Sequence, residues 1–255
     1  MLEQSPVIYL YDGSFAGLLC CVFESYAQKE IPADILLRDM AGTLLLPMKE
    51  IFTDPQKANR VLVSIPKKMG RDALDFLRHA FLTCLPQKEL HMLLFLRLGY
   101  QHGPAVMDML ANDVMDKLFK SVRHLKKESH LFKGFLRFAV FNEVLVGEIE
   151  PQNYVLPLLA GHFRRRYRSE HFLIFDRTHR EVLAYRPYQS AIMALDELVL
   201  PEPDEQERFF RDLWRHFYDA IEISERRNPR CRMSQMPKRY WQHMTEFERP
   251  LEEQH

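Results

Sequence analysis

Cysteine is scarce in this chain, and its four cysteines are badly spaced for disulfides or for a metal site. Cys20 and Cys21 are adjacent within a helical hydrophobic pattern, while Cys84 and Cys231 stand alone. A disulfide framework needs several regularly spaced cysteines, and a zinc or iron–sulfur site normally uses CxxC pairs. We therefore predict no disulfide framework and no metal, and expect Cys20 and Cys21 to be buried hydrophobic residues.

Long apolar runs and net charge are also missing. No hydrophobic stretch approaches the roughly 18 residues of a membrane span, and Glu3 and Pro6 interrupt what would be a secretory signal. We therefore expect a cytoplasmic protein with no membrane partner. The 35 Lys and Arg residues balance the 35 Asp and Glu residues, which argues against a histone-like protein.

Familiar catalytic motifs are absent as well. The sequence contains no Ser-His-Asp nucleophile elbow, HExxH, Walker loop or GxGxxG, and its eleven histidines are scattered. These absences predict no bound cofactor, and they leave open whether the chain is an enzyme.

Hydrophobic periodicity predicts an α+β fold. The predicted strands, hairpins and helices are a strand at 7–11, a helix at 15–28, strand-like segments at 35–52, helices beginning at Pro55 and broken at Pro66, a long helix at 112–133 stopped by Gly134, hairpins at 135–149 and 172–185, and helices at 154–168 and from 207. We expect one domain spanning 1–255, with an antiparallel sheet built from the N-terminal strand and the two hairpins. A helical subdomain at about 54–110 and a C-terminal helix complete it.

Positive charge is concentrated in the second half of the chain. Between Lys117 and Arg186 there are 14 Lys or Arg residues and 7 Asp or Glu residues. The helix at 154–168 ends in Arg164, Arg165, Arg166 and Arg168. A basic helix end complements the helix dipole, but arginine also pairs bidentately with phosphate oxygens. We predict that these four bind nucleic acid together with Arg137, Lys238 and Arg239; a solvated helix face is the alternative.

The stretch from Trp214 to Trp241 interleaves aromatic and basic residues. This composition suits nucleic-acid binding, and an amphipathic helix with core aromatics is the alternative. The i, i+3, i+4, i+7 spacing of Trp214, Phe217, Tyr218 and Ile221 predicts their burial against the sheet.

Pro237 is expected to open a last short helix with Lys238 and Trp241 on one side. We expect Tyr240 and Trp241 to anchor this helix. Lys238 and Arg239 are expected to face the ligand and to contribute little to stability.

Four further residues form a candidate polar site: Asp12, Glu128, His130 and His162. Asp12 lies in a strand-to-helix turn, DGSFAG, which could bind an anion but lacks the lysine of a phosphate loop. Glu128 and His130 are two residues apart, so they do not share a helix face. We expect Glu128 to pair with an arginine such as Arg137 or Arg165. His162 precedes Phe163 and the arginine run.

Several segments resemble one bacterial family of DNA metabolism or DNA repair proteins: YDGSFAGLLCCVFESY, ESHLFKGFLRF, YVLPLLAGHFRRRY, FLIFDRTHREVLAYR and MPKRYW. The resemblance runs from the first strand to Trp241, except that Arg71–Gly103 shows no family motif. Members are encoded beside a radical S-adenosylmethionine (SAM) protein described as a DNA modification or repair enzyme. Related domains occur fused to uracil-DNA glycosylase-type domains.

The resemblance implies a pathway and a partner rather than a reaction. It implies a nucleic-acid-binding accessory protein of DNA repair, with DNA and the radical SAM protein as its partners. One alternative is a DNA-processing enzyme of the base-excision type. The other is a protein-interaction module that does not bind nucleic acid.

Overall fold

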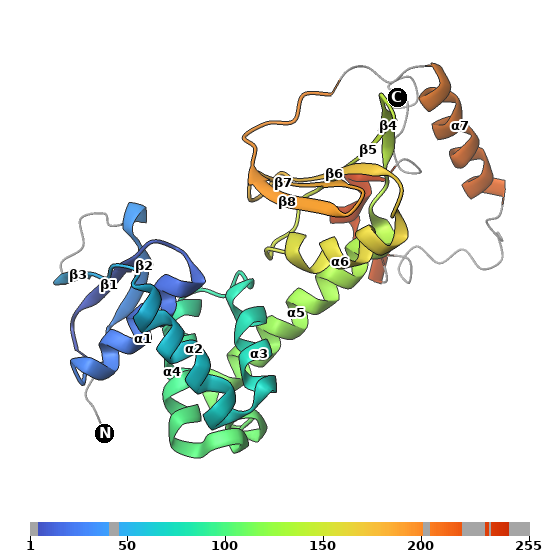
Figure 1. Ribbon diagram of the computed structural model, residues 1–255. Coiled ribbons are helices and arrows are strands. Elements are labelled where there is room, and N and C mark those ends of the chain that lie inside the picture. Colours follow the sequence, from blue (N-terminus) through green and yellow to red (C-terminus); the bar gives the residue numbers. More distant parts are fainter. Residues whose placement is uncertain (1–4, 41–45, 201–204, 221–232, 235, 245–255) are drawn as a thin grey trace. The chain divides into compact units, whose positions relative to one another are not determined.

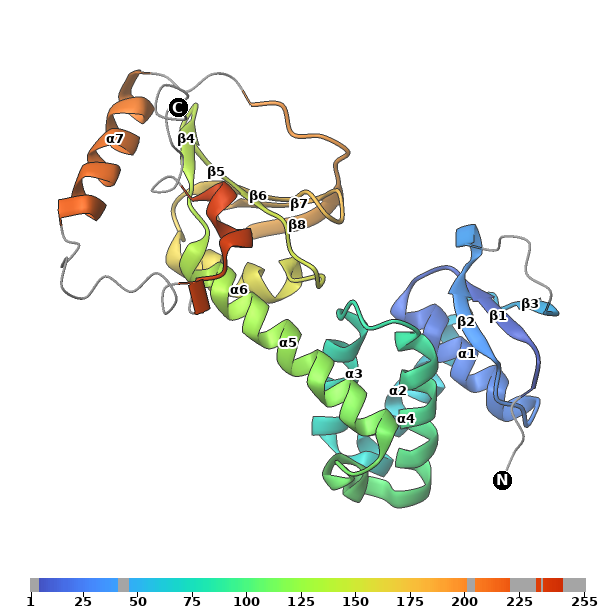
Figure 2. The same cartoon turned by 180° about the vertical axis from the view of Figure 1, so that it is seen from behind.

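A computed structural model describes residues 5–40, 46–200, 205–220, 233–234 and 236–244 (Figures 1 and 2). The sequence predicts one domain spanning 1–255. In the structure the chain groups into two compact units, Met1–Leu125 and Lys126–His255. The long helix α5 (Asp113–Phe135) contributes its first half to the first unit and its second half to the second.

The first unit begins with a small parallel sheet, which is followed by helices. Its elements are β1 (Ile8–Tyr11), α1 (Phe15–Ala27), β2 (Asp34–Leu37), η1 (Arg38–Met40), β3 (Met48–Glu50), α2 (Pro55–Met69), α3 (Arg71–Phe81), α4 (Lys88–His102) and η2 (Gly103–Asp108). The strand order is β2-β1-β3, and β1 pairs with both neighbours in parallel. The helices from α2 to η2 occupy the region where the helical subdomain is predicted.

Local signals explain where the first helices begin. The Ser14 hydroxyl accepts a hydrogen bond from Gly17 N at 2.9 Å and caps α1. Asp54 caps α2 in the same way, and Pro55 occupies its first turn. The sequence predicts that Pro66 breaks the helix, but Pro66 lies inside the last turn of α2. The helix is capped at its C-terminal end by Gly70, whose φ is 89°. A proline near a helix end removes only one backbone hydrogen bond, and the following turn is retained here.

The core of the first unit joins the sheet to its α-helices. It includes Tyr9, Leu18, Ile65, Leu77 and Phe95, each fully buried. Cys20 and Cys21 are 1% and 0% exposed, which confirms that they act as core hydrophobic residues.

The second unit is built on a five-stranded sheet. Its elements after α5 are β4 (Ala139–Phe141), β5 (Val144–Ile149), α6 (Leu156–Arg166), β6 (His171–Asp176), β7 (Glu181–Arg186), β8 (Gln189–Ala194), α7 (Glu205–Ala220) and η4 (Lys238–His243). The strand order is β4-β5-β6-β7-β8. Helix α6 lies against the sheet (Figure 1), where its buried Phe163 meets the Phe172 ring of β6 at 6.4 Å.

The prediction of an α+β fold is confirmed, but two features of the predicted sheet are wrong. The N-terminal strand does not join the hairpins, because β1 pairs with β2 and β3 inside the first unit. The two hairpins do share a sheet, but β5 and β6 run parallel in it. Helix α6 connects these two strands, and a helical crossover brings the chain back in the same direction.

In the described part of the chain, no helix combines the length and the apolar composition that a membrane crossing needs.

Candidate nucleic-acid interface

The four arginines at the C-terminal end of α6 are all exposed: Arg164, Arg165, Arg166 and Arg168. They follow the buried residues Leu159 and Phe163, which hold α6 on the sheet. Within the described residues, none of these guanidinium groups pairs with a carboxylate. The run therefore presents uncompensated positive charge to solvent.

Tyr167 places an aromatic ring within the arginine run. The Arg166 guanidinium lies 5.7 Å from the centroid of the Tyr167 ring, a cation–π distance. The same ring meets Phe138 edge-on at 5.3 Å. Tyr167 thus links the exposed arginines to Phe138, which directly precedes β4.

A cavity of about 640 Å³ adjoins this end of α6. Its charged and aromatic lining comprises Arg137, Arg166, Arg211, Glu207, Phe138, Tyr167, Phe210 and Trp214. Arginines beside aromatic rings are the combination that binds phosphates and stacks bases. Of this lining, the sequence predicts nucleic-acid binding for Arg137 and Arg166, and Trp214 opens the aromatic and basic stretch that suits such binding. Phe138, Tyr167 and Phe210 are not predicted, although the adjacency FRRRY was a signal for Tyr167.

Trp214 was predicted to be buried, and this prediction is wrong. Its side chain is 40% exposed, and Phe210 and Leu213 nearby are 54% and 53% exposed. Helical spacing shows which residues share a face but not whether that face is covered. The Arg137 guanidinium lies 5.8 Å from the Trp214 ring centroid. The side chains of Phe217 and Tyr218, and the whole of Ile221, lie outside the described residues.

The carboxylate that lines the cavity is held by the fold. Glu207 accepts a hydrogen bond from Arg211 Nε at 2.9 Å through one oxygen and from the Val140 amide at 3.2 Å through the other. Because both oxygens are engaged, Glu207 is better suited to orienting Arg211 than to removing a proton from a ligand.

His162 lies among cations and is held neutral. Burial lowers the pKa of His162, and the positive charges of Lys133, Arg166 and Arg165 lower this pKa further. Its Nε2 is buried and has no hydrogen-bond partner among the described residues. His162 therefore adds no positive charge at neutral pH. Lys133, one of the residues that lower its pKa, was not predicted as part of this region.

Among the described residues of the second unit, Glu128 is the buried carboxylate with the most hydrogen-bonding and ionic partners. It is 1% exposed and accepts hydrogen bonds from the Gln152 amide at 3.0 Å, the Asn153 amide at 2.8 Å and Asn153 Nδ2 at 2.7 Å. It pairs with an arginine, as expected, but the partner is Arg239 at 3.0 Å and neither Arg137 nor Arg165. Arg137 and Arg165 were predicted because they are closer to Glu128 in the sequence. The fold instead brings the C-terminal segment with Arg239 next to Glu128.

The C-terminal η4 segment carries two predicted binding residues with different environments. Arg239 donates to Glu128 and to the Tyr240 hydroxyl, the latter at 2.7 Å. Tyr240 is 3% exposed, which confirms its role as an anchor. Lys238 is exposed and lies 6.0 Å from the Trp241 ring centroid, on the predicted side. A role in nucleic-acid binding stays a prediction for both cations, and Arg239 is in addition part of the fold.

Asp12 and His130 are not part of this arrangement. Asp12 lies in the first unit and accepts hydrogen bonds from Thr53 Oγ1 at 2.6 Å and from Ser14. Burial alone would raise the pKa of the Asp12 carboxyl, but these hydrogen bonds outweigh it and lower the pKa. His130 is exposed on α5, whereas Glu128 is buried, which confirms that the two do not share a face.

The fold and this surface define an α+β protein whose second unit carries an arginine- and aromatic-lined cavity. Residues 86–246, more than half of the chain, match the family described as "Domain of unknown function (DUF4130)". The chain belongs to this family. No curated protein is similar enough in sequence to count as a match.

Proposed function

We propose that the second unit binds nucleic acid and that the protein is an accessory factor of DNA repair or DNA metabolism. The observation that carries nucleic-acid binding is the exposed arginine run of α6, which has no carboxylate partner among the described residues and adjoins the aromatic cavity. The DNA and the radical SAM partner are supported by the sequence resemblance alone.

Arg166 and Tyr167 connect the two parts of the proposed interface. Arg164, Arg165 and Arg168 would hold consecutive phosphates, since guanidinium groups match phosphate oxygens. The rings of Tyr167 and Trp214 line the cavity and would stack on bases. Because only unpaired bases offer their faces for stacking, this arrangement favours a single strand or an unpaired nucleotide.

The carboxylates of this region favour a binding role over base excision. Glu207 is engaged through both oxygens. A neighbouring cavity of about 470 Å³ is lined by Glu148 and Glu150. Arg177 Nη1 lies 2.9 Å from Glu148 Oε2, and Arg177 Nε lies 4.0 Å from Glu150 Oε1. An enzyme that activates water needs a basic group within reach of its substrate, and these carboxylates are committed to arginines.

The salt dependence of binding tests the interface directly. Replacing Arg165→Gln and Arg166→Gln together should flatten the slope of log affinity against log salt by about two units, because two phosphate contacts are lost. Fluorescence anisotropy with labelled single-stranded and duplex DNA measures this slope. The double variant Lys67→Gln, Lys68→Gln removes the same charge from the first unit and should leave the slope unchanged. An unchanged slope in the folded arginine variant would assign the run to helix capping or to a protein interface.

Binding to the radical SAM protein needs a separate test. Co-purification with and without damaged DNA should recover this partner, and Lys238→Ala should weaken binding to DNA while retaining the partner. Loss of the partner with intact DNA affinity would instead assign Lys238 to the protein interface.

A further inference from the structure

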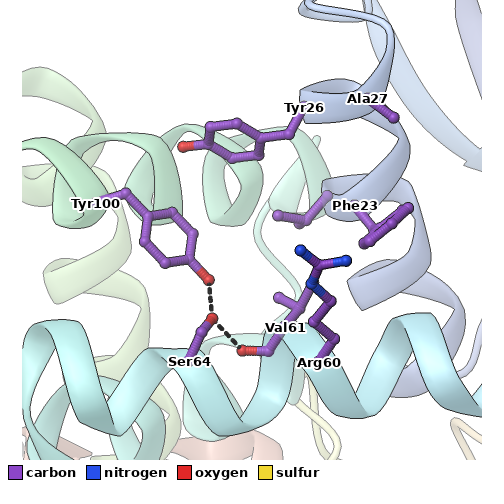
Figure 3. Close-up of a pocket in the computed structure, with 8 residues that line it drawn as sticks. Phe23, Tyr26, Ala27, Arg60, Val61, Ser64 and Tyr100 are labelled. Carbon is purple, nitrogen blue, oxygen red and sulfur yellow. Dashed lines mark hydrogen bonds between the residues drawn. The ribbon is translucent and has the colours of Figure 1, made fainter.

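The first unit contains a cavity of about 410 Å³ between α1, α2 and α4 (Figure 3). Phe23 and Tyr26 come from α1, Arg60 and Ser64 from α2, and Tyr100 from α4. This volume lies in the range of pockets that bind small molecules. The cavity is separate from the interface proposed above, and only Tyr100 among its lining residues falls within the family segment 86–246.

The aromatic walls of this cavity are held in place by neighbouring groups. The Tyr26 ring meets the Tyr100 ring edge-on, with a centroid distance of 5.6 Å and an interplanar angle of 89°. The Arg97 guanidinium lies 4.7 Å from the Tyr26 centroid and donates a hydrogen bond to Ser25 Oγ at 2.9 Å. The rings are therefore positioned before any ligand binds, which reduces the entropic cost of binding.

The hydroxyl groups in the cavity have a defined donor direction. Ser64 Oγ donates to the Val61 carbonyl at 2.7 Å, and a hydroxyl carries a single proton. The Tyr100 hydroxyl, 2.5 Å from Ser64 Oγ, must therefore be the donor in that contact. Burial raises the pKa of Tyr100, so it keeps this proton. The Tyr100 oxygen is left with acceptor capacity and no proton to offer, so it selects a ligand that donates an N–H or O–H group.

Arg60 supplies a positive charge at the cavity. It rises from α2 toward α1 (Figure 3), and its guanidinium lies 5.8 Å from the Phe23 ring centroid. Within the described ranges no carboxylate pairs with Arg60. An unpaired guanidinium beside aromatic rings suits an anionic group attached to a planar ring.

We propose that this cavity binds a single nucleotide, with its base against the rings of Tyr26 and Tyr100 and its phosphate on Arg60. A ring or exocyclic N–H of the base donates to the Tyr100 oxygen. The same chemistry is present in a free nucleoside monophosphate and in the terminal nucleotide of a strand. The proposal does not depend on nucleic-acid binding by the second unit, because the two sites share no residue.

Calorimetric titration of the full chain with each nucleoside monophosphate tests the free ligand. A single strand with a terminal phosphate, compared with the same strand without it, tests the terminal nucleotide. Arg60→Gln should weaken binding about tenfold to a hundredfold, the effect of losing one charged hydrogen bond. Tyr100→Phe keeps the ring, removes the acceptor and should weaken binding about tenfold. Lys67→Gln removes a charge from the same helix outside the cavity and should leave affinity unchanged.

The variants separate this site from the arginine interface. The Arg165→Gln, Arg166→Gln variant should retain mononucleotide binding, while Arg60→Gln should retain the salt slope measured with DNA that lacks a terminal phosphate. Binding of the phosphorylated strand but of no free nucleotide supports the terminal nucleotide as the source. Absence of binding to both, or binding that Arg60→Gln leaves unchanged, overturns the proposal and leaves Arg60 as a residue that covers Phe23.

Discussion

Glu128 shows how one buried carboxylate connects distant parts of the second unit. It joins α5 to the Gln152–Asn153 loop through three hydrogen bonds and to η4 through Arg239. A buried charge that loses its counterion is left with a large desolvation cost. The expectation of little contribution to stability therefore stays a prediction for Lys238, while for Arg239 the ion pair with Glu128 argues against it.

Arg239→Ala should lower the free energy of unfolding by about 2 kcal/mol, the range for a hydrogen bond to a charged group. The three remaining hydrogen bonds of Glu128 keep the loss from being larger. Lys238→Ala, an adjacent exposed cation, should stay within about 0.5 kcal/mol of the unmodified protein. Urea unfolding monitored by circular dichroism measures both, and equal effects would contradict the assignment of the ion pair.

His162 should make the stability of the second unit depend on pH. Its pKa in the folded state is lowered from 6.5 by burial and by nearby cations, so the unfolded state binds more protons in the window below 6.5. Stability should therefore fall as the pH drops below 6.5 and level off above it. Thermal unfolding over this range measures the effect, and His162→Gln should remove this part of the pH dependence. An unchanged profile would show that another group titrates there.

At the scale of elements, the sequence predicts strands and helices better than it predicts their neighbours. The turn at Asn142-Glu143 and the hydrophobic run after it predict the β4–β5 hairpin correctly. The parallel pairing of β5 and β6 is set by the crossover of α6 over the sheet, which local periodicity does not encode. Strand β8 (Gln189–Ala194) was missed because its residues are largely exposed and show no apolar alternation.

Gly147 lies where β5 packs closely against the segment after α5, and a substitution there tests this packing. A Cβ at this position would lie 2.8 Å from Leu136 Cδ1 and 3.0 Å from the Arg137 carbonyl oxygen. Gly147→Ala should cost about 1–3 kcal/mol, as overpacking does in tight cores. Differential scanning calorimetry of purified variants measures the change.

Gly134 provides the control for Gly147. It was predicted to stop the long helix, but α5 continues to Phe135, and a Cβ at Gly134 meets nothing within 4 Å. Gly134→Ala should raise stability by up to about 1 kcal/mol, because alanine has less backbone freedom to lose on folding. A similar loss of stability in Gly134→Ala, where no atom obstructs the added Cβ, would contradict the assignment of the Gly147→Ala cost to its close contact.

At the scale of the whole molecule, the candidate sites follow the two units and not the boundary of the family segment. Residues 86–246 begin just before α4, inside the first unit, and leave out its sheet and its first three α-helices. The arginine run can be located from the sequence, because four arginines in five positions stand out. The cavity of the first unit cannot, because its residues come from three helices that only the fold brings together.

The fragment 86–246 should not be stable by itself. In the full chain Leu93, Phe95 and Leu96 of α4 are completely buried in a core that the omitted elements help to build. The fragment should expose these side chains, bind a hydrophobic dye and elute as aggregates in size-exclusion chromatography. The full chain is the reference, and a monomeric fragment that does not bind the dye would contradict this expectation.

The Glu128–Arg239 ion pair has a consequence for the order in which the protein is made. Arg239 lies more than a hundred residues downstream of Glu128, so the ribosome completes the sheet and α6 long before it supplies this counterion. Until then the carboxylate lacks this counterion, and Phe132 and Phe135 lack the Tyr240 ring that packs on them. The first unit has all its core residues at an earlier stage of translation, whereas the second unit can reach its final packing only after η4 has left the exit tunnel.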